Sequence, residues 1–159
     1  LESEKEKGST FYIVIPYKPG SISNTQNAST IKILDAKKTH TILIAEDEEI
    51  NYLYIETLFE KNIQGNFSLL HAKNGKEAVD ICHKNTDICL VLMDIKMPLM
   101  NGYEATKKIK SEFPNLPIIA QTAYSTESDK TIALSHGCDD FISKPIRKEM
   151  LFEIVKKHI

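Results

Sequence analysis

The sequence predicts an α/β fold, a doubly wound parallel sheet of five strands with helices on both faces. From residue 41 onward, short apolar runs alternate five times with amphipathic helical patterns over about 120 residues. The run Ile88–Met93 contains no polar residue, which is typical of a central parallel strand covered on both faces. A (βα)5 arrangement accounts for both observations.

The elements follow one another in a regular order. Each strand is a short apolar run, and each helix has apolar residues three or four positions apart. Asn74 is placed to cap the second helix, and Gly137 is placed to end the fourth. The strands are expected at Thr41–Ala45, Phe67–Ala72, Ile88–Met93, Pro117–Gln121 and Phe141–Ile142. The helices are expected to include Ile50–Leu58, Ala78–Cys82, Tyr103–Ile109, Thr126–Gly137 and Met150–His158.

The chain divides into three parts. Residues 1–17 contain one strand signal, Thr10–Ile15, stopped by Pro16, which is too little for a domain. Residues 18–39 are rich in Ser, Thr, Asn and Gln and are expected to form a flexible linker. Residues 40–159 are expected to form the α/β domain. The chain begins at Leu1 rather than Met, so we expect it to be a piece of a longer protein.

Composition excludes several classes of protein. Apolar residues make up 42% of the chain and charged residues 26%, which argues against general disorder. The net charge is −2 and Arg147 is the single arginine, so direct binding to DNA or RNA is not expected. No apolar run approaches the ~20 residues that span a bilayer, so this segment is not expected to contact a membrane. Nothing indicates an oligomeric state.

The cysteines favour a reducing compartment. Cys82, Cys89 and Cys138 are odd in number, lie in apolar stretches and form no C-x-x-C pair. We therefore expect reduced, packed thiols in a cytoplasmic segment, without disulfides or a zinc site.

Polar side chains stand where four of the five predicted strands end. Glu46 and Asp47 follow the first strand, Asp94 the third, Thr122 the fourth and Lys144 the fifth. Right-handed crossovers bring these strand ends to one edge of the sheet, where α/β proteins bind ligands. Three carboxylates at close quarters require a cation, and an all-oxygen ligand set favours Mg²⁺ over Zn²⁺. The acidic residues that follow, Glu48 and Glu49, are interpreted as favouring the start of the first helix.

Four segments in this order resemble the receiver domain of two-component response regulators. They are Ala45–Glu49, Met93–Glu104, Gln121–Ala123 and Phe141–Pro145, and the resemblance covers residues 41–159. It implies a flavodoxin-like fold with strand order 2-1-3-4-5 and a function in phosphorelay signal transduction. It also implies a cis peptide bond between Lys144 and Pro145.

The resemblance implies a role for each residue at the strand ends. Asp94 is the expected phosphoacceptor, which takes a phosphoryl group from a phosphohistidine. Thr122 and Lys144 are expected to bind phosphoryl oxygens, so that positioning and charge neutralisation provide the catalysis. The expected ligands of Mg²⁺, or of Mn²⁺ in its place, are Glu46, Asp47, Asp94 and the backbone carbonyl of Lys96.

Two further pairs of residues receive expected roles from the resemblance. Thr122 and Phe141 would form the switch, Thr122 following the new charge and Phe141 turning into the vacated space. The plainer interpretation of Phe141 is a core aromatic. Lys96 and Tyr124 would flank the phosphoryl group and tune its hydrolysis. The Tyr124 ring is expected to shield the phosphoryl group from water, unless it points to solvent and contributes nothing.

A second resemblance lies upstream. Leu1–Ser3 together with Gly8–Pro16 is similar to the last hairpin of the histidine-kinase ATP-binding domain. Together with the linker, it implies the C-terminal receiver of a hybrid sensor histidine kinase, whose parent chain could be anchored in a membrane through upstream segments. The segment itself is expected neither to bind ATP nor to phosphorylate itself from it. Its expected partner is a phosphohistidine-bearing kinase or phosphotransfer domain, which we expect to belong to its own parent chain.

Three alternatives remain open at this point. The first is a free-standing response regulator. The second is a metal-dependent phosphatase with Asp94 as its nucleophile, although the residues after Asp94 lack the D-x-D or D-K-T-G arrangement. The third is a flavodoxin-like cofactor binder, although Glu46 and Asp47 would repel a phosphate after the first strand.

Overall fold

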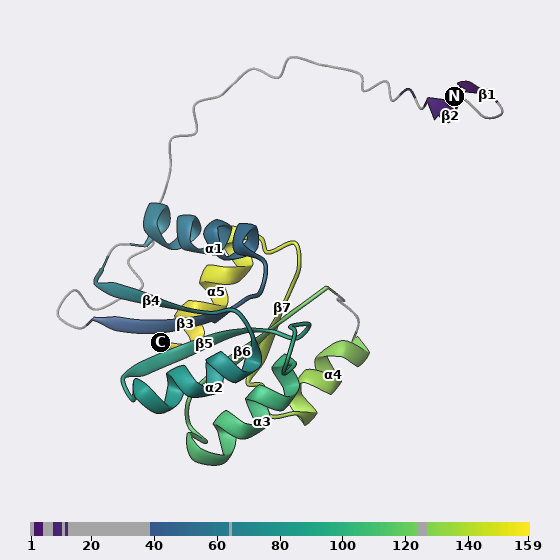
Figure 1. The fold of residues 1–159 in the computed structure, drawn as a ribbon. Coiled ribbons are helices and arrows are strands. Elements are labelled where there is room, and N and C mark those ends of the chain that lie inside the picture. The colour runs from purple at the N-terminus through teal and green to yellow at the C-terminus, as the bar shows by residue number, and fades with distance from the viewer. Residues whose placement is uncertain (1, 5–7, 11, 13–38, 64, 124–126) are drawn as a thin grey trace.

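The computed structural model of the chain describes residues 2–4, 8–10, 12, 39–63, 65–123 and 127–159 (Figure 1). Five parallel strands form one sheet in the order β4-β3-β5-β6-β7. Counted from β3, this order is 2-1-3-4-5, so the predicted topology is confirmed. The strands are β3 (His40–Ala45), β4 (Phe67–Ala72), β5 (Ile88–Asp94), β6 (Ile118–Thr122) and β7 (Asp140–Ser143).

Helices cover both faces of this sheet. Helices α1 and α5 lie on one face, and α2, α3 and α4 lie on the other (Figure 1). The helices are α1 (Glu49–Asn62), α2 (Gly75–Lys84), α3 (Gly102–Glu112), α4 (Glu127–Ser135) and α5 (Lys148–His158). The three-layer arrangement follows from parallel strands, since each crossover must return over a face of the sheet.

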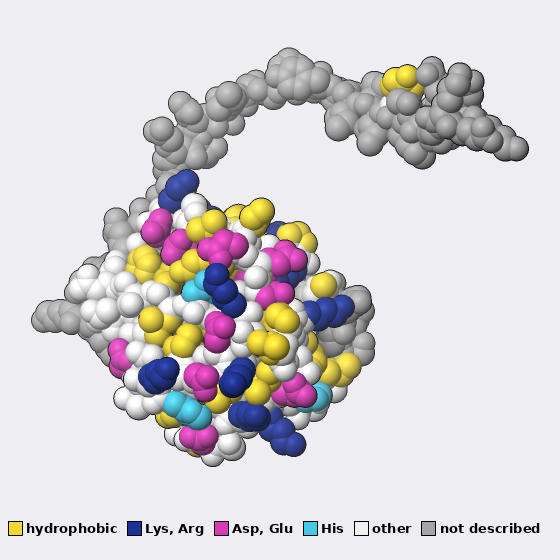
Figure 2. All heavy atoms as spheres, viewed as in Figure 1, with side chains coloured by type: hydrophobic (Ala, Val, Ile, Leu, Met, Phe, Trp, Pro, Cys, Tyr) yellow, Lys and Arg dark blue, Asp and Glu magenta, His cyan; other side chains and the backbone are white. Residues whose placement is uncertain are grey.

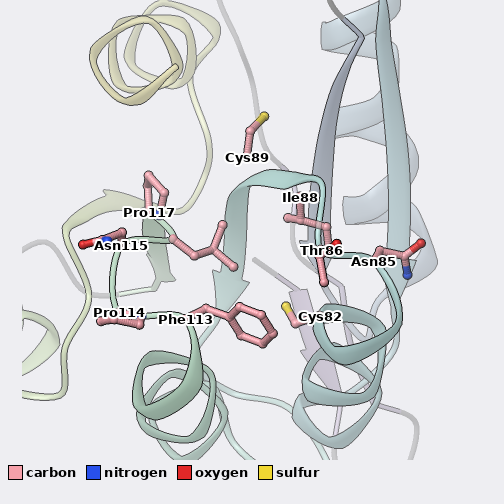
Figure 3. A pocket seen from close by; sticks show the side chains of 10 residues that line it. Cys82, Asn85, Thr86, Ile88, Cys89, Phe113, Pro114, Asn115 and Pro117 are labelled. Carbon is pink, nitrogen blue, oxygen red and sulfur yellow. The ribbon is translucent and has the colours of Figure 1, made fainter.

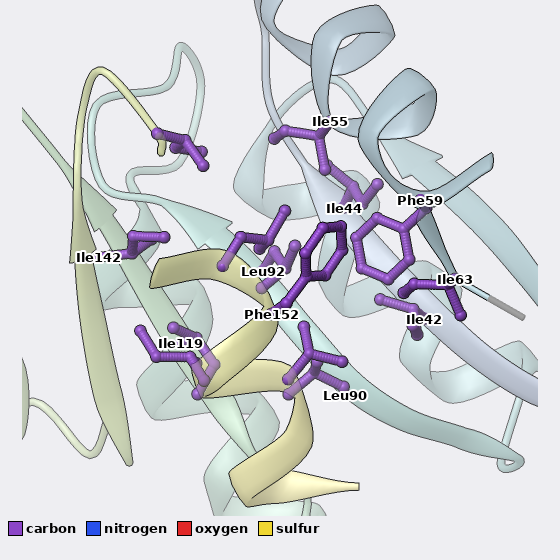
Figure 4. Packing of buried hydrophobic residues seen from close by; sticks show 14 of the residues in the cluster. Ile42, Ile44, Ile55, Phe59, Ile63, Leu90, Leu92, Ile119, Ile142 and Phe152 are labelled. Atoms are coloured by element: carbon purple, nitrogen blue, oxygen red, sulfur yellow. The ribbon is translucent and has the colours of Figure 1, made fainter. Parts of the chain in front are cut away.

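Alternation along β3 shows why both faces are apolar. Ile42 and Ile44 pack in the cluster under α1 and α5, whereas Leu43 and Ala45 pack in the cluster under α2 and α3. In the first cluster the rings of Phe59 and Phe152 meet edge to face, with centroids 6.1 Å apart (Figure 4). These two cores hold the sheet rigid, so the carboxyl ends of the strands are fixed relative to one another.

The predicted helix ends are confirmed where the structure describes them. The Asn74 side chain caps α2 by accepting a hydrogen bond from the Glu77 amide at 2.9 Å. Gly137 follows α4 with φ of +94°, a conformation that favours glycine at a helix end. Glu48 precedes α1 as expected, but its side chain makes no capping hydrogen bond. The expected start of α4 at Thr126 lies outside the described residues.

The loop after β5 requires a glycine. A Cβ added to Gly102 would lie 2.1 Å from the Asp94 carbonyl oxygen, so only glycine allows α3 to begin this close to β5. Asn101 caps α3 and Glu104 returns the interaction, which completes a capping box. The start of α3 is thereby held against the end of β5.

The N-terminal residues form a separate two-stranded pair. Strands β1 (Glu2–Glu4) and β2 (Gly8–Thr10) are antiparallel, with Ser3 opposite Ser9. Most of the strand expected at Thr10–Ile15 and nearly all of the expected linker lie outside the described residues. The division at residues 17 and 39 therefore stays a prediction.

Three expectations from composition can be compared with the structure. Among the described residues, no helix is long and apolar enough to cross a membrane. Cys82, Cys89 and Cys138 are free thiols, the first and last of them buried. On the face in Figure 2, side chains of both charges are interspersed with apolar ones.

Candidate functional site

Six of the predicted site residues, Glu46, Asp47, Asp94, Lys96, Thr122 and Lys144, converge on one cavity of about 490 Å³ at the carboxyl edge of the sheet. Glu46 and Asp47 follow β3, Asp94 ends β5, and Thr122 ends β6. Lys144 follows β7 and is brought close because its amide donates to the Thr122 carbonyl at 2.7 Å. The cavity is lined by Glu46, Asp47, Glu48, Asn51, Asp94, Ile95, Lys96, Tyr103, Gln121, Thr122, Ala123, Ile132 and Lys144.

Lys144 bridges two buried carboxylates. Its Nζ lies 2.7 Å from Glu46 Oε2 and 2.6 Å from Asp94 Oδ2. The Glu46 side chain is fully buried and that of Asp94 is 9% exposed. The peptide bond from Lys144 to Pro145 is cis, as the resemblance implied.

Burial and pairing act in opposite directions on these charges. Desolvation raises the pKa of Glu46 above its usual value, although hydrogen bonds from Lys144 and Asn51 oppose it. Burial by itself lowers the pKa of Lys144, but its hydrogen bonds to Asp94 and Glu46 outweigh burial and raise it. Lys144 therefore stays an ammonium ion at neutral pH, and its positive charge compensates the negative charges of Glu46 and Asp94.

The acidic cluster has the chemistry of a hard-cation site. One carboxylate oxygen from each of Glu46, Asp47 and Asp94 lies within 4.8 Å of the others. Glu46 and Asp94 are buried, whereas Asp47 is exposed to solvent. Oxygen ligands at this spacing, with one side open to water, suit Mg²⁺, which keeps part of its hydration shell. The residues present therefore fit the expected cation.

The loop that carries Glu46 and Asp47 is held by residues that the sequence analysis did not single out. Asn51, on the first turns of α1, donates from Nδ2 to Glu46 Oε1 at 2.9 Å. His71, near the end of β4, lies 2.8 Å from the Glu46 carbonyl oxygen through Nε2, which must be the donor because a carbonyl only accepts. The His71 ring stacks on Tyr52, with centroids 3.8 Å apart.

The remaining predicted residues occupy different places. Thr122 is 8% exposed and lines the cavity. Lys96 also lines it, and its amide donates to Asp94 Oδ1 at 3.1 Å. Phe141 is half-buried against Ala120, Ala133 and Cys138, away from the cavity lining. Tyr124 lies outside the described residues, so its expected shielding role stays a prediction.

A second cavity, of about 410 Å³, lies at the opposite edge of the sheet (Figure 3). It is lined by Ile88 at the start of β5, by Phe113 and the loop before β6, and by two cysteines. Burial raises the pKa of the Cys82 thiol to about 11, so that thiol is protonated and unreactive at neutral pH. This cavity lacks the convergent charges of the carboxyl edge.

Two proteins similar in sequence place the chain among signalling proteins. Hybrid signal transduction histidine kinase I of Dictyostelium discoideum is 40% identical over 126 residues, which are 74% of this chain but 7% of that protein. The polar-differentiation response regulator DivK of Brucella anthropi is 32% identical over 121 residues, which are 75% of this chain and 95% of that protein. The chain thus spans only a small part of the first relative and nearly all of the second.

Solved structures agree with these relatives. The receiver domain of the Pseudomonas aeruginosa sensor histidine kinase PA1611, with a magnesium ion coordinated in its active-site cleft, is 27% identical at a TM-score of 0.67. That match covers 76% of this chain and 98% of the other. The receiver domain of Saccharomyces cerevisiae Ssk1, solved with the phosphotransfer protein Ypd1, is 31% identical at a TM-score of 0.67, with coverage of 76% and 88%.

The family model of the response regulator receiver domain matches residues 42–156. This range begins in β3 and ends in α5, so it contains all of the sheet except the first two residues of β3, and it contains every predicted site residue. The chain therefore belongs to the response regulator receiver domain family, the phosphorelay module of two-component signalling.

Proposed function

We propose that this receiver domain accepts a phosphoryl group on Asp94 from a phosphohistidine, in a transfer that depends on Mg²⁺. The observation that carries the proposal is the ammonium group of Lys144, which binds both Asp94 and Glu46. The Asp94 carboxylate in this arrangement lines the cavity, so a bound group can reach it. A purely structural ion pair would not need the third carboxylate, Asp47, on the open side.

The transfer forms one bond and breaks one. A carboxylate oxygen of Asp94 attacks the phosphorus, the P–N bond of the phosphohistidine breaks, and its electron pair stays on the imidazole nitrogen, which takes up a proton from water. The product is an acyl phosphate on Asp94 and a neutral histidine. Lys144 would bind a phosphoryl oxygen, and the contact of its ammonium group with Asp94 Oδ2 supports this role. Thr122 would bind a second oxygen through its hydroxyl.

The proposed cation ligands are Glu46, Asp47, Asp94 and the backbone carbonyl of Lys96. Receiver domains bind Mg²⁺ at an acidic site, and the magnesium-bound receiver of PA1611 supports the same use of the cluster here. Bound Mg²⁺ supplies positive charge next to the phosphoryl oxygens. Asn51 and His71 would keep Glu46 oriented toward that position through the hydrogen bonds described above.

We propose that Thr122 and Phe141 transmit the phosphorylated state. Thr122 ends β6, and Phe141 stands in register with Ala120 on the adjoining strand. The Phe141 ring is half-buried, and Lys130 Nζ of α4 lies 5.9 Å from its centroid. A displacement of the loop after Thr122 would therefore be passed to a half-buried ring that contacts α4.

We further propose that the parent is a hybrid sensor histidine kinase that acts in the cytoplasm. The sequence relation to the Dictyostelium hybrid kinase and the antiparallel pair β1–β2 ahead of the receiver support this parent. The linker of residues 18–39 would let the receiver reach the phosphohistidine of its own chain at high effective concentration. The relation to DivK supports the alternative of a free-standing regulator.

The phosphoryl donor is a phosphohistidine on a kinase or phosphotransfer domain. The Ssk1 receiver forms its complex with a histidine phosphotransfer protein, which supports a donor of this kind. Incubation with acetyl phosphate tests the site without the donor. We expect one phosphoryl group per chain by intact-mass spectrometry, only when Mg²⁺ is present, and none in Asp94→Asn. Steady release of inorganic phosphate without a stable adduct would contradict the proposal and favour the phosphatase.

A further inference from the structure

Gln121 is a buried polar residue of the cavity that the proposed function does not use. It is fully buried in β6, one position before Thr122. Neither the oxygen nor the nitrogen of its carboxamide has a hydrogen-bond partner among the residues that the structure describes. A buried amide without partners costs free energy, so its presence at this position needs a physical reason.

The register of the sheet places Gln121 beside the proposed phosphoacceptor. Gln121 pairs with Asp94 on one side and with Ile142 on the other. Strands in a sheet lie about 4.8 Å apart, and paired residues point to the same face, so the two side chains are neighbours. Gln121 also lines the cavity that holds Glu46 and Lys144.

An apolar residue would satisfy packing at this position. Side chains alternate along a strand, so Gln121 shares its face with Ile119, which packs in the cluster under α1 and α5. Ile142, its partner on β7, belongs to the same apolar cluster. Packing therefore does not account for the carboxamide, whose burial without a hydrogen-bond partner among the described residues costs free energy. A group bound in the cavity could supply that partner.

We infer that Gln121 is a further binding residue of this site, whose carboxamide is hydrogen-bonded by an oxygen atom of the occupied cavity. The oxygen is either that of a water carried by the cation, donating to Oε1, or a phosphoryl oxygen, accepting from Nε2. This inference rests on the proposed function. Because the amide gains a partner only on occupation, Gln121 destabilises the empty domain and favours the occupied one.

Two methionine variants on one face of β6 test the inference. Gln121→Met keeps the length of the side chain and removes the amide, and Ile119→Met is the control at a fully buried position outside the cavity lining. Without Mg²⁺, we expect Gln121→Met to unfold at the same or a higher urea concentration than the wild type. We expect the affinity of Gln121→Met for Mg²⁺, or for Mg²⁺ together with beryllofluoride, to fall about tenfold. This is the effect of one hydrogen bond to a charged group.

Calorimetric titration distinguishes the two sources of oxygen. A weaker response of Gln121→Met to Mg²⁺ alone identifies a cation-bound water, and a loss seen only with Mg²⁺ and beryllofluoride, a phosphoryl analogue, identifies a phosphoryl oxygen. Equal affinity of variant and wild type in both titrations would overturn the inference. A lowered urea midpoint, shared by Gln121→Leu, would also overturn it, since the amide would then be partnered in the empty domain. Failure of the wild type itself to bind would instead contradict the proposed function.

Discussion

At the scale of single residues, Lys144 controls the electrostatics of the site. It contributes the positive charge that contacts Glu46 and Asp94, and its own side chain is only 22% exposed. Removing one partner of a buried ion pair leaves the other charge without compensation, which is more costly than the pair is favourable. Asn51 and His71 act differently, because they orient the Glu46 loop without changing its charge.

Lys144→Met should destabilise the domain in a manner that depends on Mg²⁺. Without the ammonium group, Glu46 and Asp94 face each other uncompensated, so we expect the free energy of unfolding to fall by roughly 2 kcal/mol. Added Mg²⁺ should restore part of this loss, because it supplies the missing charge. Urea denaturation with and without Mg²⁺ measures both effects. Lys107→Met, which removes an exposed charge on α3, should change stability by less than about 0.5 kcal/mol. A Lys144→Met protein as stable as this control would contradict the prediction.

At the scale of elements, β7 and α5 are joined by the Asp140 carboxylate. Lys157 Nζ and His158 Nε2, at the end of α5, lie 2.8 Å and 3.2 Å from Asp140 Oδ2. Burial by itself raises the pKa of Asp140, but hydrogen bonds from Lys157, the Phe141 amide and His158 outweigh burial and lower it. The Asp140 carboxylate therefore links α5 to β7, the edge strand that contains Phe141.

This junction predicts a stability loss in acid. Because the pKa of Asp140 is lower in the folded chain than in the unfolded one, its contribution is complete above the usual value of 3.8 and disappears as the pH falls through the folded value. Asp140→Asn should therefore be less stable than the wild type at neutral pH, and the difference should shrink below about pH 4. Urea midpoints measured across this range test it, with Glu153→Gln on α5 as the control. A difference that is constant with pH would contradict the assignment.

At the scale of the whole molecule, the sheet and its functional edge could be predicted from local signals. The strand Phe67–Ala72 has its predicted bounds, and β6 begins one residue late because Pro117 has no amide to donate to a ladder. Asn51, His71 and Gln121 were missed because their roles depend on partners far away in space. The signal for His71 is a polar side chain near the end of the second strand, at the same edge of the sheet as Glu46. Gln121 could have been noticed as a polar residue on the apolar side of a buried strand.

The central claim is that Asp94 is the carboxylate that carries the phosphoryl group. Borohydride reduction after incubation with acetyl phosphate and Mg²⁺ converts a phosphorylated aspartate to homoserine, and peptide mapping locates the altered residue. We predict homoserine at position 94 and at no other position. Homoserine at Asp47, which shares the acidic cluster, or at Asp87 on the opposite edge of the sheet, would contradict the claim.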